Sequence, residues 1–301
     1  MIGSDGGFYS ASLDDQTGRE LYPHLDAVTA GWVAPAGRLQ VVDGGFLLSG
    51  RWSFGSGCTH ADVIIGGAAV FDGGQVLLGA DGKPELRVAL LPAAQFEILD
   101  TWYTTGLAGS GSHDYTIDGT FVPMERTFRF GEVKRPGALY AWPGLFFANI
   151  PGVPLGVARD ALDTTTALLA DKLILPERKL ARDEPRVRSA VARAQALIGS
   201  ARSYVFDVLG AFWATLQAGD IPTLHQRAAL GGCYVHTFRA CLEAVQLLYE
   251  TVGSAAIYRT CPLDRHLRDL ITMGQHILAQ TRLLEVVGGM WFGVEPENPV
   301  L

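Results

Sequence analysis

The first half of the chain alternates short hydrophobic runs with polar turns. Between about residues 30 and 130, runs rich in valine, isoleucine, leucine and phenylalanine are separated by Asp-Gly pairs. Asp-Gly readily adopts the left-handed backbone of a tight hairpin, so each pair predicts a turn between antiparallel strands. The pairs are Asp43-Gly44, Asp72-Gly73, Asp81-Gly82 and Asp118-Gly119. The pattern predicts an antiparallel barrel or sandwich, with Tyr115–Ile117 and Thr120–Val122 forming the last hairpin.

The hydrophobic period changes near residue 135 and becomes helical after Pro151. Four long helices are predicted, with proline or glycine at the breaks between them: residues 155–173, 185–218, 222–252 and 264–290. Long helices with short connections favour an antiparallel four-helix bundle. Their apolar faces, for example around Phe206 and Phe212, are too extensive for one bundle to bury, which predicts a helical interface in an oligomer.

The first thirty residues follow neither pattern. Residues 10–22 mix Leu13 with charged side chains such as Arg19 and Glu20, which predicts a short surface helix. This segment is too small to form a domain of its own.

A helix start that carries several ionisable groups follows Pro262. Asp264 is predicted to cap the helix, and Asp269, Thr272 and His276 then fall three and four positions apart on one face. A polar stripe on an otherwise apolar helix lines water, a partner or a ligand. Because imidazole titrates near neutral pH, His276 is the side chain best suited to proton transfer. A helix cap with satisfied polar groups in the core explains the same pattern, so both interpretations stay open.

Composition excludes several classes of function. The chain has 301 residues, of which 48% are hydrophobic and 18% charged, and its formal net charge is −7. These values allow a large core in one or two domains and argue against nucleic acid as a partner. The basic stretch 178–193 is interrupted by acidic residues, which is typical of a solvated helix face. Since no membrane-length apolar run and no secretory signal are visible, we expect a cytoplasmic protein without a membrane partner.

No metal or nucleophile motif accompanies this composition. The four cysteines show no CxxC or Cys/His metal spacing, and the seven histidines contain no HExxH pair, so we predict no metal site. No Gly-x-Gly-x-x-Gly loop follows a strand and opens a helix, and no Gly-x-Ser-x-Gly elbow occurs. His113 and Asp114 are adjacent, but neighbouring strand residues point to opposite faces, so we do not expect them to act on each other.

Three segments resemble the acyl-CoA dehydrogenase superfamily and, more narrowly, its two-component (group D) flavin-dependent monooxygenase branch. They read DGGFLLSGRWSFGSGCTHAD at residues 43–62, DTWYTTGLAGSGSHDYTIDGTFVP at residues 100–123 and PLDRHLRDLITMGQH at residues 262–276. The resemblance covers nearly the whole chain. It implies an α+β architecture in which an all-helical N-terminal domain, a central β-barrel and a C-terminal four-helix bundle assemble as tetramers. The barrel and the bundle coincide with the elements predicted above.

The helical N-terminal domain of this family is essentially missing from the chain. Residues 1–25 resemble only its end, whereas residues 26–135 match the barrel and residues 136–301 match the bundle. The chain is therefore expected to lack roughly a hundred N-terminal residues, a typical domain's worth. A misassigned start, an engineered fragment and a natural truncation would look alike in the sequence.

The resemblance implies flavin or substrate contacts in the stretch Trp52–Gly57. In dehydrogenase members a Trp-Ile-Thr-Asn-Gly segment lies on the flavin, and the matching residues here read Trp-Ser-Phe-Gly-Ser-Gly. Trp52 would supply a planar wall, Ser56 a hydroxyl at the ring edge and Gly57 close backbone approach. Without the resemblance, the same stretch is interpreted as a strand with a bulge at residues 55–57.

A glycine-rich loop at residues 106–113 resembles a family loop that usually reads Gly-Leu-Arg-Gly-Thr-Gly-Ser. Ser110 and Ser112 are implied to donate hydrogen bonds to a phosphate or to a flavin edge. Ala108 stands where arginine is common, and a methyl group cannot replace a guanidinium donor. A plain Gly-Ser loop between strands is the alternative interpretation.

His276 matches a histidine that, in the monooxygenases, is proposed to deprotonate the phenol or to assist the flavin peroxide. Residues 270–276 contain no carboxylate, which argues against desaturation of an acyl-CoA, because that reaction needs a carboxylate base. Arg268 and Asp269 are implied to form an ion pair that braces the helix. Arg265 and His266 are implied to contact a flavin tail or a neighbouring subunit.

These motifs together predict an oxidoreductase that uses reduced flavin (FMN or FAD) and O2 to hydroxylate an aromatic or polyketide-type substrate. His276 and Ser56 are its predicted catalytic residues. The implied partners are a small-molecule substrate, a separate flavin reductase and further copies of the chain in a dimer or tetramer. A non-catalytic or auxiliary homologue without flavin turnover is the alternative, and an acyl-CoA dehydrogenase fits less well.

Overall fold

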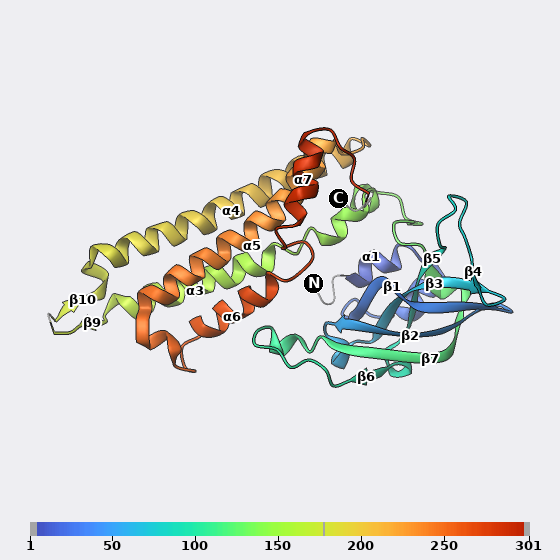
Figure 1. Cartoon of the computed structure of the whole chain (residues 1–301), viewed down its shortest axis with the longest axis horizontal. Helices are drawn as coiled ribbons and strands as arrows, with labels where there is room; N and C mark the ends of the chain where they lie inside the picture. Colours follow the sequence, from blue (N-terminus) through green and yellow to red (C-terminus); the bar gives the residue numbers. More distant parts are fainter. Residues whose placement is uncertain (1–4, 177, 298–301) are drawn as a thin grey trace. The chain divides into compact units, whose positions relative to one another are not determined.

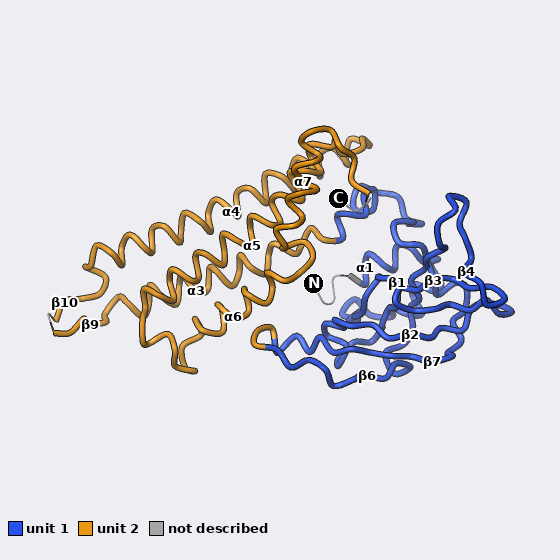
Figure 2. The backbone as a smooth tube through the Cα atoms, in the orientation of Figure 1, with its two compact units in different colours: residues 1–104, 108–146 blue, residues 105–107, 147–301 orange. Residues whose placement is uncertain are grey.

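The computed structural model describes residues 5–176 and 178–297, which fall into two compact units (Figure 1, Figure 2). The sheet unit comprises the described residues of 1–104 and 108–146. The helical unit comprises the described residues of 105–107 and 147–301. Residues 105–107 thus belong to the helical unit, although the chain before and after them belongs to the sheet unit, as the colours of Figure 2 show.

The sheet unit is built on one mixed eight-stranded sheet. Its strands are β1 (Thr29–Val42), β2 (Gly45–Gly55), β3 (Val63–Asp72), β4 (Gln75–Val76), β5 (Leu86–Pro92), β6 (Glu97–Leu99), β7 (His113–Pro123) and β8 (Thr127–Phe128). The order is β6-β7-β2-β1-β3-β5-β8, with β4 paired to β3.

The predicted barrel or sandwich is corrected in two respects. Strands β1 and β3 pair in parallel, and within the described residues no pairing of β6 with β8 closes the sheet into a barrel. Strand β2 lies between β1 and β7, so β3 pairs with the other edge of β1. Because β3 and β1 both run opposite to β2, they are parallel to each other.

Two predicted hairpins are confirmed in their register. Val42 pairs with Gly45 across the turn at Asp43-Gly44, and Asp72 pairs with Gln75 across the turn at residues 73–74. The turn glycine Gly44 has a φ of 74°, which is the left-handed conformation that the Asp-Gly pattern predicts.

The predicted hairpin at Asp118-Gly119 is wrong, because β7 runs through these residues as one strand. Asp118 and Gly119 lie opposite the single residue Ser49 of β2, which makes a β-bulge. Gly119 has a φ of 57° and donates its N–H to Ser49 Oγ at 2.8 Å, while Ser49 Oγ donates to Asp118 at 2.9 Å. A bulge and a hairpin need the same left-handed glycine, so the dipeptide alone cannot distinguish them.

The main core of the sheet unit is organised around Trp52 and Tyr115. Their rings stack with centroids 5.4 Å apart, and both side chains are fully buried. Trp52 donates its Nε1–H to the Gly67 carbonyl of β3 at 2.8 Å, and Tyr115 donates its hydroxyl to the Ile65 carbonyl at 2.8 Å. Tyr115 thus reaches from β7 to β3 across the two strands between them, so the sheet is strongly curved. A Cβ on any of three glycines would lie under 3 Å from the Trp52 ring: Gly37, Gly50 and Gly66.

Two short helices, α1 (Asp5–Ser10) and α2 (Asp15–Leu21), also belong to the sheet unit. The Asp14 side chain caps α2 by accepting the Thr17 N–H at 2.9 Å. The predicted short surface helix is therefore present, with its charged residues exposed. Leu13 and Leu21 are buried in a second core cluster with residues of β3 and β5, because their apolar side chains cover that face of the sheet.

The helical unit contains α3 (Gly152–Ala170), α4 (Pro185–Gln217), α5 (Leu224–Val252), α6 (Leu263–Met273) and α7 (Leu283–Trp291). A small hairpin of β9 (Leu173–Ile174) and β10 (Lys179–Leu180) lies between α3 and α4. Helix α5 contacts all four other helices. A capping box of Thr223 and Gln226 starts α5, and Pro185 is the first residue of α4. None of the described helices has the length and apolarity needed to cross a membrane.

The fourth predicted helix, residues 264–290, is wrong as a continuous element. It is divided into α6 and α7 by turns at residues 274–282. Gly274, a weak helix former, closes α6, and nearby side chains then take the backbone groups that a helix would use. Gln280 donates to the Gln275 carbonyl at 2.7 Å, and the Leu278 N–H donates to His276 Nδ1 at 3.3 Å.

Candidate functional site

The end of β2 departs from regular strand geometry at Ser53 and Phe54. These two residues lie opposite the single residue Asp114 of β7, so the strand bulges there. Phe54 has a φ of 61°, an uncommon conformation for a residue with a side chain, and its ring is 54% exposed. The bulge predicted at residues 55–57 therefore lies slightly earlier in the chain, and it turns Phe54 out of the core.

Three predicted site residues come together beside this bulge. The hydroxyl of Ser112 lies 2.7 Å from Ser56 Oγ and 2.7 Å from Ser110 Oγ. Gly57, with a φ of 79°, donates its N–H to the Ser110 carbonyl at 2.9 Å, which joins the two segments through their backbones. The contacts of Ser56 with Ser112 and of Gly57 with Ser110 join residues more than fifty positions apart. We call Ser56, Ser110 and Ser112 the hydroxyl cluster.

Trp52, by contrast, is 1% exposed and its N–H is satisfied inside the core. Trp52, which was predicted to form a planar wall for the flavin, therefore lies inside the core of the sheet unit. The aromatic side chain that this segment exposes is Phe54, whose ring lies 5.5 Å from that of Trp32 and 6.2 Å from that of Trp102. Sequence reasoning missed Phe54, since the only signal for it was an aromatic residue directly before a Gly-Ser-Gly sequence.

His113 and Asp114 turn to different partners, which confirms that they do not form a catalytic pair. His113 Nδ1 accepts the N–H groups of Thr101 at 3.1 Å and Trp102 at 3.3 Å, and so holds the segment that carries Trp102. Asp114 accepts a hydrogen bond from Arg51 at 2.7 Å, which lowers the pKa of the Asp114 carboxyl.

Helix α6 binds residues 105–107 through two adjacent side chains. Arg268 donates to the Thr105 carbonyl at 2.5 Å, and Asp269 Oδ1 accepts the Leu107 N–H at 2.6 Å. The expected ion pair between Arg268 and Asp269 is therefore wrong, because successive helix residues point in different directions. Arg268 pairs instead with Asp264 at 2.8 Å, one turn earlier. Asp264 in turn is not the N-cap, since α6 begins at Leu263.

His276 lies in the turn after α6, so it does not share a helix face with Asp269 and Thr272 as predicted. The break at Gly274 separates it from them. Burial lowers the pKa of His276 below its ordinary value, which favours the neutral ring near pH 7. Because Nδ1 accepts the Leu278 N–H at 3.3 Å, the proton of the neutral ring is on Nε2.

The other ionisable residues of α6 have separate environments. His266 is buried, and its Nε2 lies 2.9 Å from the Asp160 carboxylate of α3. Burial lowers the pKa of His266, and the charge of Asp160 opposes that shift. Arg265, the predicted contact to a flavin tail, is an exposed residue of α6.

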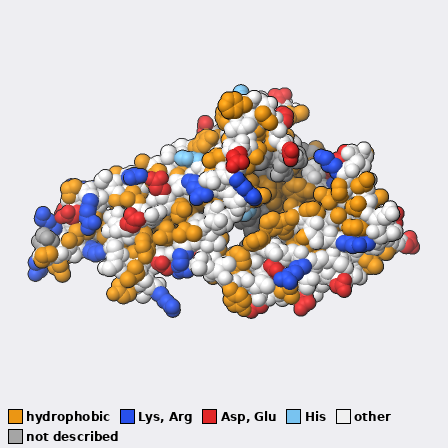
Figure 3. Space-filling model, in the orientation of Figure 1, with side chains coloured by type: hydrophobic (Ala, Val, Ile, Leu, Met, Phe, Trp, Pro, Cys, Tyr) orange, Lys and Arg blue, Asp and Glu red, His pale blue; other side chains and the backbone are white. Residues whose placement is uncertain are grey.

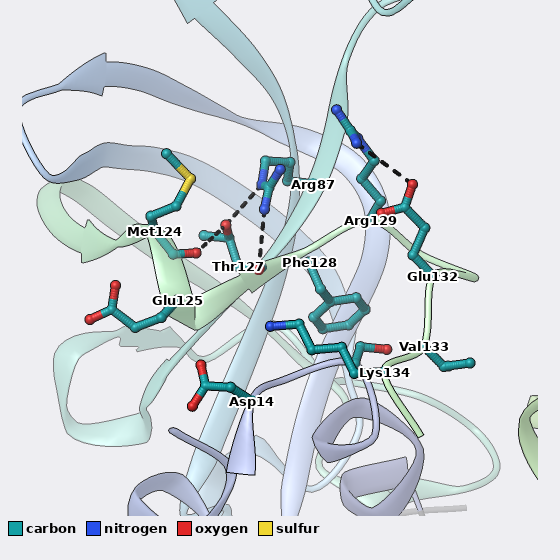
Figure 4. Close-up of a pocket in the computed structure, with 11 residues that line it drawn as sticks. Asp14, Arg87, Met124, Glu125, Thr127, Phe128, Arg129, Glu132, Val133 and Lys134 are labelled. Atoms are coloured by element: carbon teal, nitrogen blue, oxygen red, sulfur yellow. Dashed lines mark hydrogen bonds and ion pairs between the residues drawn. The ribbon is translucent and has the colours of Figure 1, made fainter. Parts of the chain in front are cut away.

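A charged cavity of about 340 Å³ opens elsewhere in the sheet unit (Figure 4). Arg87 donates to Thr127 Oγ1 at 2.8 Å on its wall, and Arg129 pairs with Glu85 at 2.6 Å. The cavity is lined by cations and anions in similar number, and no predicted site residue is among them.

Comparison with known proteins places this geometry in a family. The family model for the acyl-CoA dehydrogenase C-terminal domain matches residues 149–281, which lie in the helical unit. The chain is 31% identical over 292 residues to an indole-3-acetate monooxygenase of Pseudomonas putida, covering 96% of this chain and 73% of that protein. It belongs to the flavin-dependent monooxygenase branch of the acyl-CoA dehydrogenase superfamily.

A second relative and one solved structure are also similar to this chain. The oxygenase component of an FADH2-dependent resorcinol hydroxylase from Rhizobium sp. is 29% identical, with 91% of this chain and 70% of that protein covered. The structure of XiaF from Streptomyces sp., solved with FADH2 and glycerol, superposes with a TM-score of 0.86 at 23% identity. That comparison covers 99% of this chain and 77% of XiaF, and it shows the shared fold.

The two units of this fold differ in whether the predicted site residues lie close together. The sheet unit gathers Ser56, Ser110 and Ser112, whereas the helical unit separates His276 from the polar residues of α6. Among the described residues, no group of three or more His, Cys, Asp or Glu side chains is arranged to hold a metal ion.

Proposed function

We propose that this chain is the oxygenase component of a two-component monooxygenase that hydroxylates an aromatic substrate with reduced flavin and O2. The hydroxyl cluster beside the exposed ring of Phe54 is the observation that carries the proposal, because it occupies the segments that resemble the family's flavin contacts. The similarity to the indole-3-acetate monooxygenase over 96% of the chain supports the same activity.

The residues of the hydroxyl cluster fit a flavin edge, which presents carbonyl and ring-nitrogen acceptors. When the hydrogen-bond chain runs from Ser110 through Ser112 to Ser56, the Ser56 O–H is left to donate to a ligand. The exposed ring of Phe54 offers an apolar surface for a planar ligand. Trp52 would contribute indirectly, by anchoring β2 in the core. Gly57 keeps its proposed role in close backbone approach to the flavin, and Arg265 keeps its role as a contact to a flavin tail.

Reduced flavin, when bound, supplies the two electrons with which one atom of O2 enters the substrate and the other leaves as water. We propose His276 as a hydrogen-bond donor in this reaction. Its neutral ring carries the proton on Nε2, so it can donate a hydrogen bond there and stabilise negative charge that develops on a reacting oxygen, while keeping its proton. To act as a base at Nε2, the ring would have to give up the Leu278 N–H and move its proton to Nδ1.

We also propose the finer architecture of the family for this chain. Residues 1–25 would correspond to the end of the family's helical domain, residues 26–135 to its barrel domain, whose sheet is open in the described residues, and residues 136–301 to its bundle. Figure 3 shows hydrophobic side chains on the visible face of the helices, and the exposed large residues of the helical unit include Phe206, Trp213, Trp291 and Phe292. Such surfaces support a homodimer or homotetramer. The choice of FMN or FAD, the reductase partner and the cytoplasmic location are parts of the same proposal.

One observation favours a second candidate, an auxiliary homologue without flavin turnover. Ala108 replaces the arginine that is common in the glycine-rich loop, and it lies in a short 3-10 helix, η3 (Ala108–Ser110), immediately before Ser112. Loss of that guanidinium would remove a charge-assisted donor.

The test is anaerobic titration of the full chain with FADH2 and with FMNH2, followed by reaction with ¹⁸O2 and either indole-3-acetate or resorcinol. We expect saturable binding of one reduced flavin and a product that carries one ¹⁸O atom. Failure to bind either reduced flavin would favour the auxiliary homologue. Binding without product from these two compounds would place the substrate in another class of aromatic compounds.

A further inference from the structure

The backbone at residues 105–107 is held in a strained conformation. Leu107 has a φ of 54°, which costs a leucine roughly 1 kcal/mol or more relative to ordinary backbone regions. A Cβ on Gly106 would lie 2.2 Å from the Arg268 carbonyl oxygen, so only glycine fits there. Strained backbone persists only where surrounding contacts impose it, and it concentrates at functional sites.

Helix α6 supplies those contacts from adjacent residues. Asp269 Oδ1 accepts the Leu107 N–H at 2.6 Å, a charge-assisted bond to the strained residue itself. Arg268 donates to the Thr105 carbonyl at 2.5 Å, and its pairing with Asp264 at 2.8 Å orients the guanidinium. The two side chains therefore hold the backbone on both sides of Gly106. We call Arg268 and Asp269 the clamp.

The chain leaves the clamp directly into the hydroxyl cluster. Leu107 is followed by η3, and Gly111 closes that turn by donating its N–H to the Ala108 carbonyl at 3.3 Å. Ser110 and Ser112 follow within five residues of Leu107. The backbone held at Leu107 therefore leads, through one hydrogen-bonded turn, directly into the segment that carries both hydroxyls.

We propose that Asp269 and Arg268 are positioning residues of the flavin site. By holding Leu107 in its left-handed conformation, they fix the loop whose Ser110 and Ser112 orient the Ser56 hydroxyl toward the ligand. This inference rests on the proposed function, since it takes reduced flavin as the ligand of the hydroxyl cluster. The clamp itself touches neither substrate nor cofactor in this assignment.

The experiment compares Asp269→Asn with Asp163→Asn in the full chain. Asp163 is an exposed helix aspartate that pairs with Arg159 at 3.7 Å, so its replacement makes the same chemical change away from the loop. Losing a charge-assisted bond is expected to raise the Kd for reduced flavin about tenfold or more in Asp269→Asn. Asp163→Asn should keep the wild-type Kd, and the yield of hydroxylated product per O2 consumed should fall only in Asp269→Asn.

A rescue separates positioning from general destabilisation. If Asp269 acts by holding a left-handed Leu107, then Leu107→Gly in the Asp269→Asn background should recover part of the lost affinity, because glycine adopts that conformation without strain. Gly106→Ala is the second variant, since its methyl group must displace the loop from α6 without changing any charge. It should weaken flavin binding while urea unfolding shows that the helical unit remains folded.

The outcomes distinguish the two proposals. Wild-type protein that binds no reduced flavin would overturn the proposed function itself. Wild-type binding with an unchanged Kd in both Asp269→Asn and Gly106→Ala would overturn the clamp and leave the function intact. Lost affinity without any recovery in the Leu107→Gly double variant would also count against positioning through Leu107.

Discussion

In the sheet unit the three predicted serines lie in contact with one another. In the helical unit the residues of the predicted polar stripe do not share one helix face. Ser56, Ser110 and Ser112 meet because β2 and β7 pair and the loops at their ends then lie side by side. The stripe predicted through Asp269, Thr272 and His276 depended on one uninterrupted helix, which ends at Met273. Strand pairing continues past a local bulge, but residues share a helix face only as long as the helix is uninterrupted.

A common feature underlies this contrast. In each unit one aromatic or histidine side chain of the family motif is buried: Trp52 in the sheet unit and His266 in the helical unit. A second one lies at an irregular position of the backbone: Phe54 at a bulge and His276 in a turn. We therefore expect substitutions of the first pair to affect stability and substitutions of the second pair to affect ligand binding or turnover.

The largest effect is expected for His276→Ala. Removing one hydrogen-bond donor that stabilises developing charge typically lowers turnover by about 10² to 10³-fold, so product formation should fall by at least about 10²-fold. Binding of reduced flavin should change little, because the hydroxyl cluster is intact. Single-turnover product analysis and anaerobic titration measure the two quantities, and turnover equal to that of wild type would remove His276 from the reaction.

The variants Trp52→Ala and Phe54→Ala should distinguish a core residue from a ligand-binding residue within the same strand. Trp52 fills a slot lined by glycines, so its truncation is expected to lower the free energy of unfolding by about 3–5 kcal/mol. Phe54→Ala should cost less than about 1 kcal/mol, because the ring is half exposed, and should weaken flavin binding instead. Urea titration provides both free energies. Comparable losses of stability in the two variants would contradict the division.

Ser56→Ala is expected to weaken binding of reduced flavin by about tenfold, since it removes the hydroxyl at the end of the hydrogen-bond chain. Ser200→Ala is the matched control, because Ser200 is a surface residue of α4 whose hydroxyl bonds only locally, to the Leu197 carbonyl. Fluorescence-monitored anaerobic titration gives both Kd values. Equal affinities would remove Ser56 from the site.

The smallest effect is a pH dependence that involves His266. Burial lowers the pKa values of His266 and His276 in the folded chain, so the unfolded chain binds protons more readily. Stability is therefore fully present above the ordinary histidine pKa and is lost as the pH falls below it. Asp160→Asn removes the charge that opposes this shift at His266, so its loss of stability between pH 7 and pH 5 should exceed that of wild type. Urea midpoints at both pH values test this, and parallel losses would show that Asp160 does not act on His266.

Much of the fold follows from local signals in the sequence. The Asp-Gly pairs at Asp43 and Asp72 predicted real turns, and Pro185 marks the predicted start of α4, because these residues act on their own backbone. The same signals give a wrong prediction where one backbone conformation is compatible with two different structures. Gly119 suits a hairpin and a bulge equally, and the neighbouring strand β2 selects the bulge.

The candidate site was predictable only in part. The serines of the hydroxyl cluster were identified from their motifs, but the contacts between them depend on strand pairing. The clamp was missed because Asp269 and Leu107 are far apart in the chain, and the adjacent charges of Arg268 and Asp269 suggested a mutual ion pair.

The amino-acid sequence by itself determined the change from strands to helices near residue 135, the tight turns and the family motifs, since each depends on residues within a few positions of one another. Only the tertiary structure decided that Trp52 lies in the core, that Phe54 is exposed and that His276 Nδ1 accepts the Leu278 N–H. Those outcomes depend on atoms that distant or irregular segments bring into contact, and spacing along the chain does not encode such contacts.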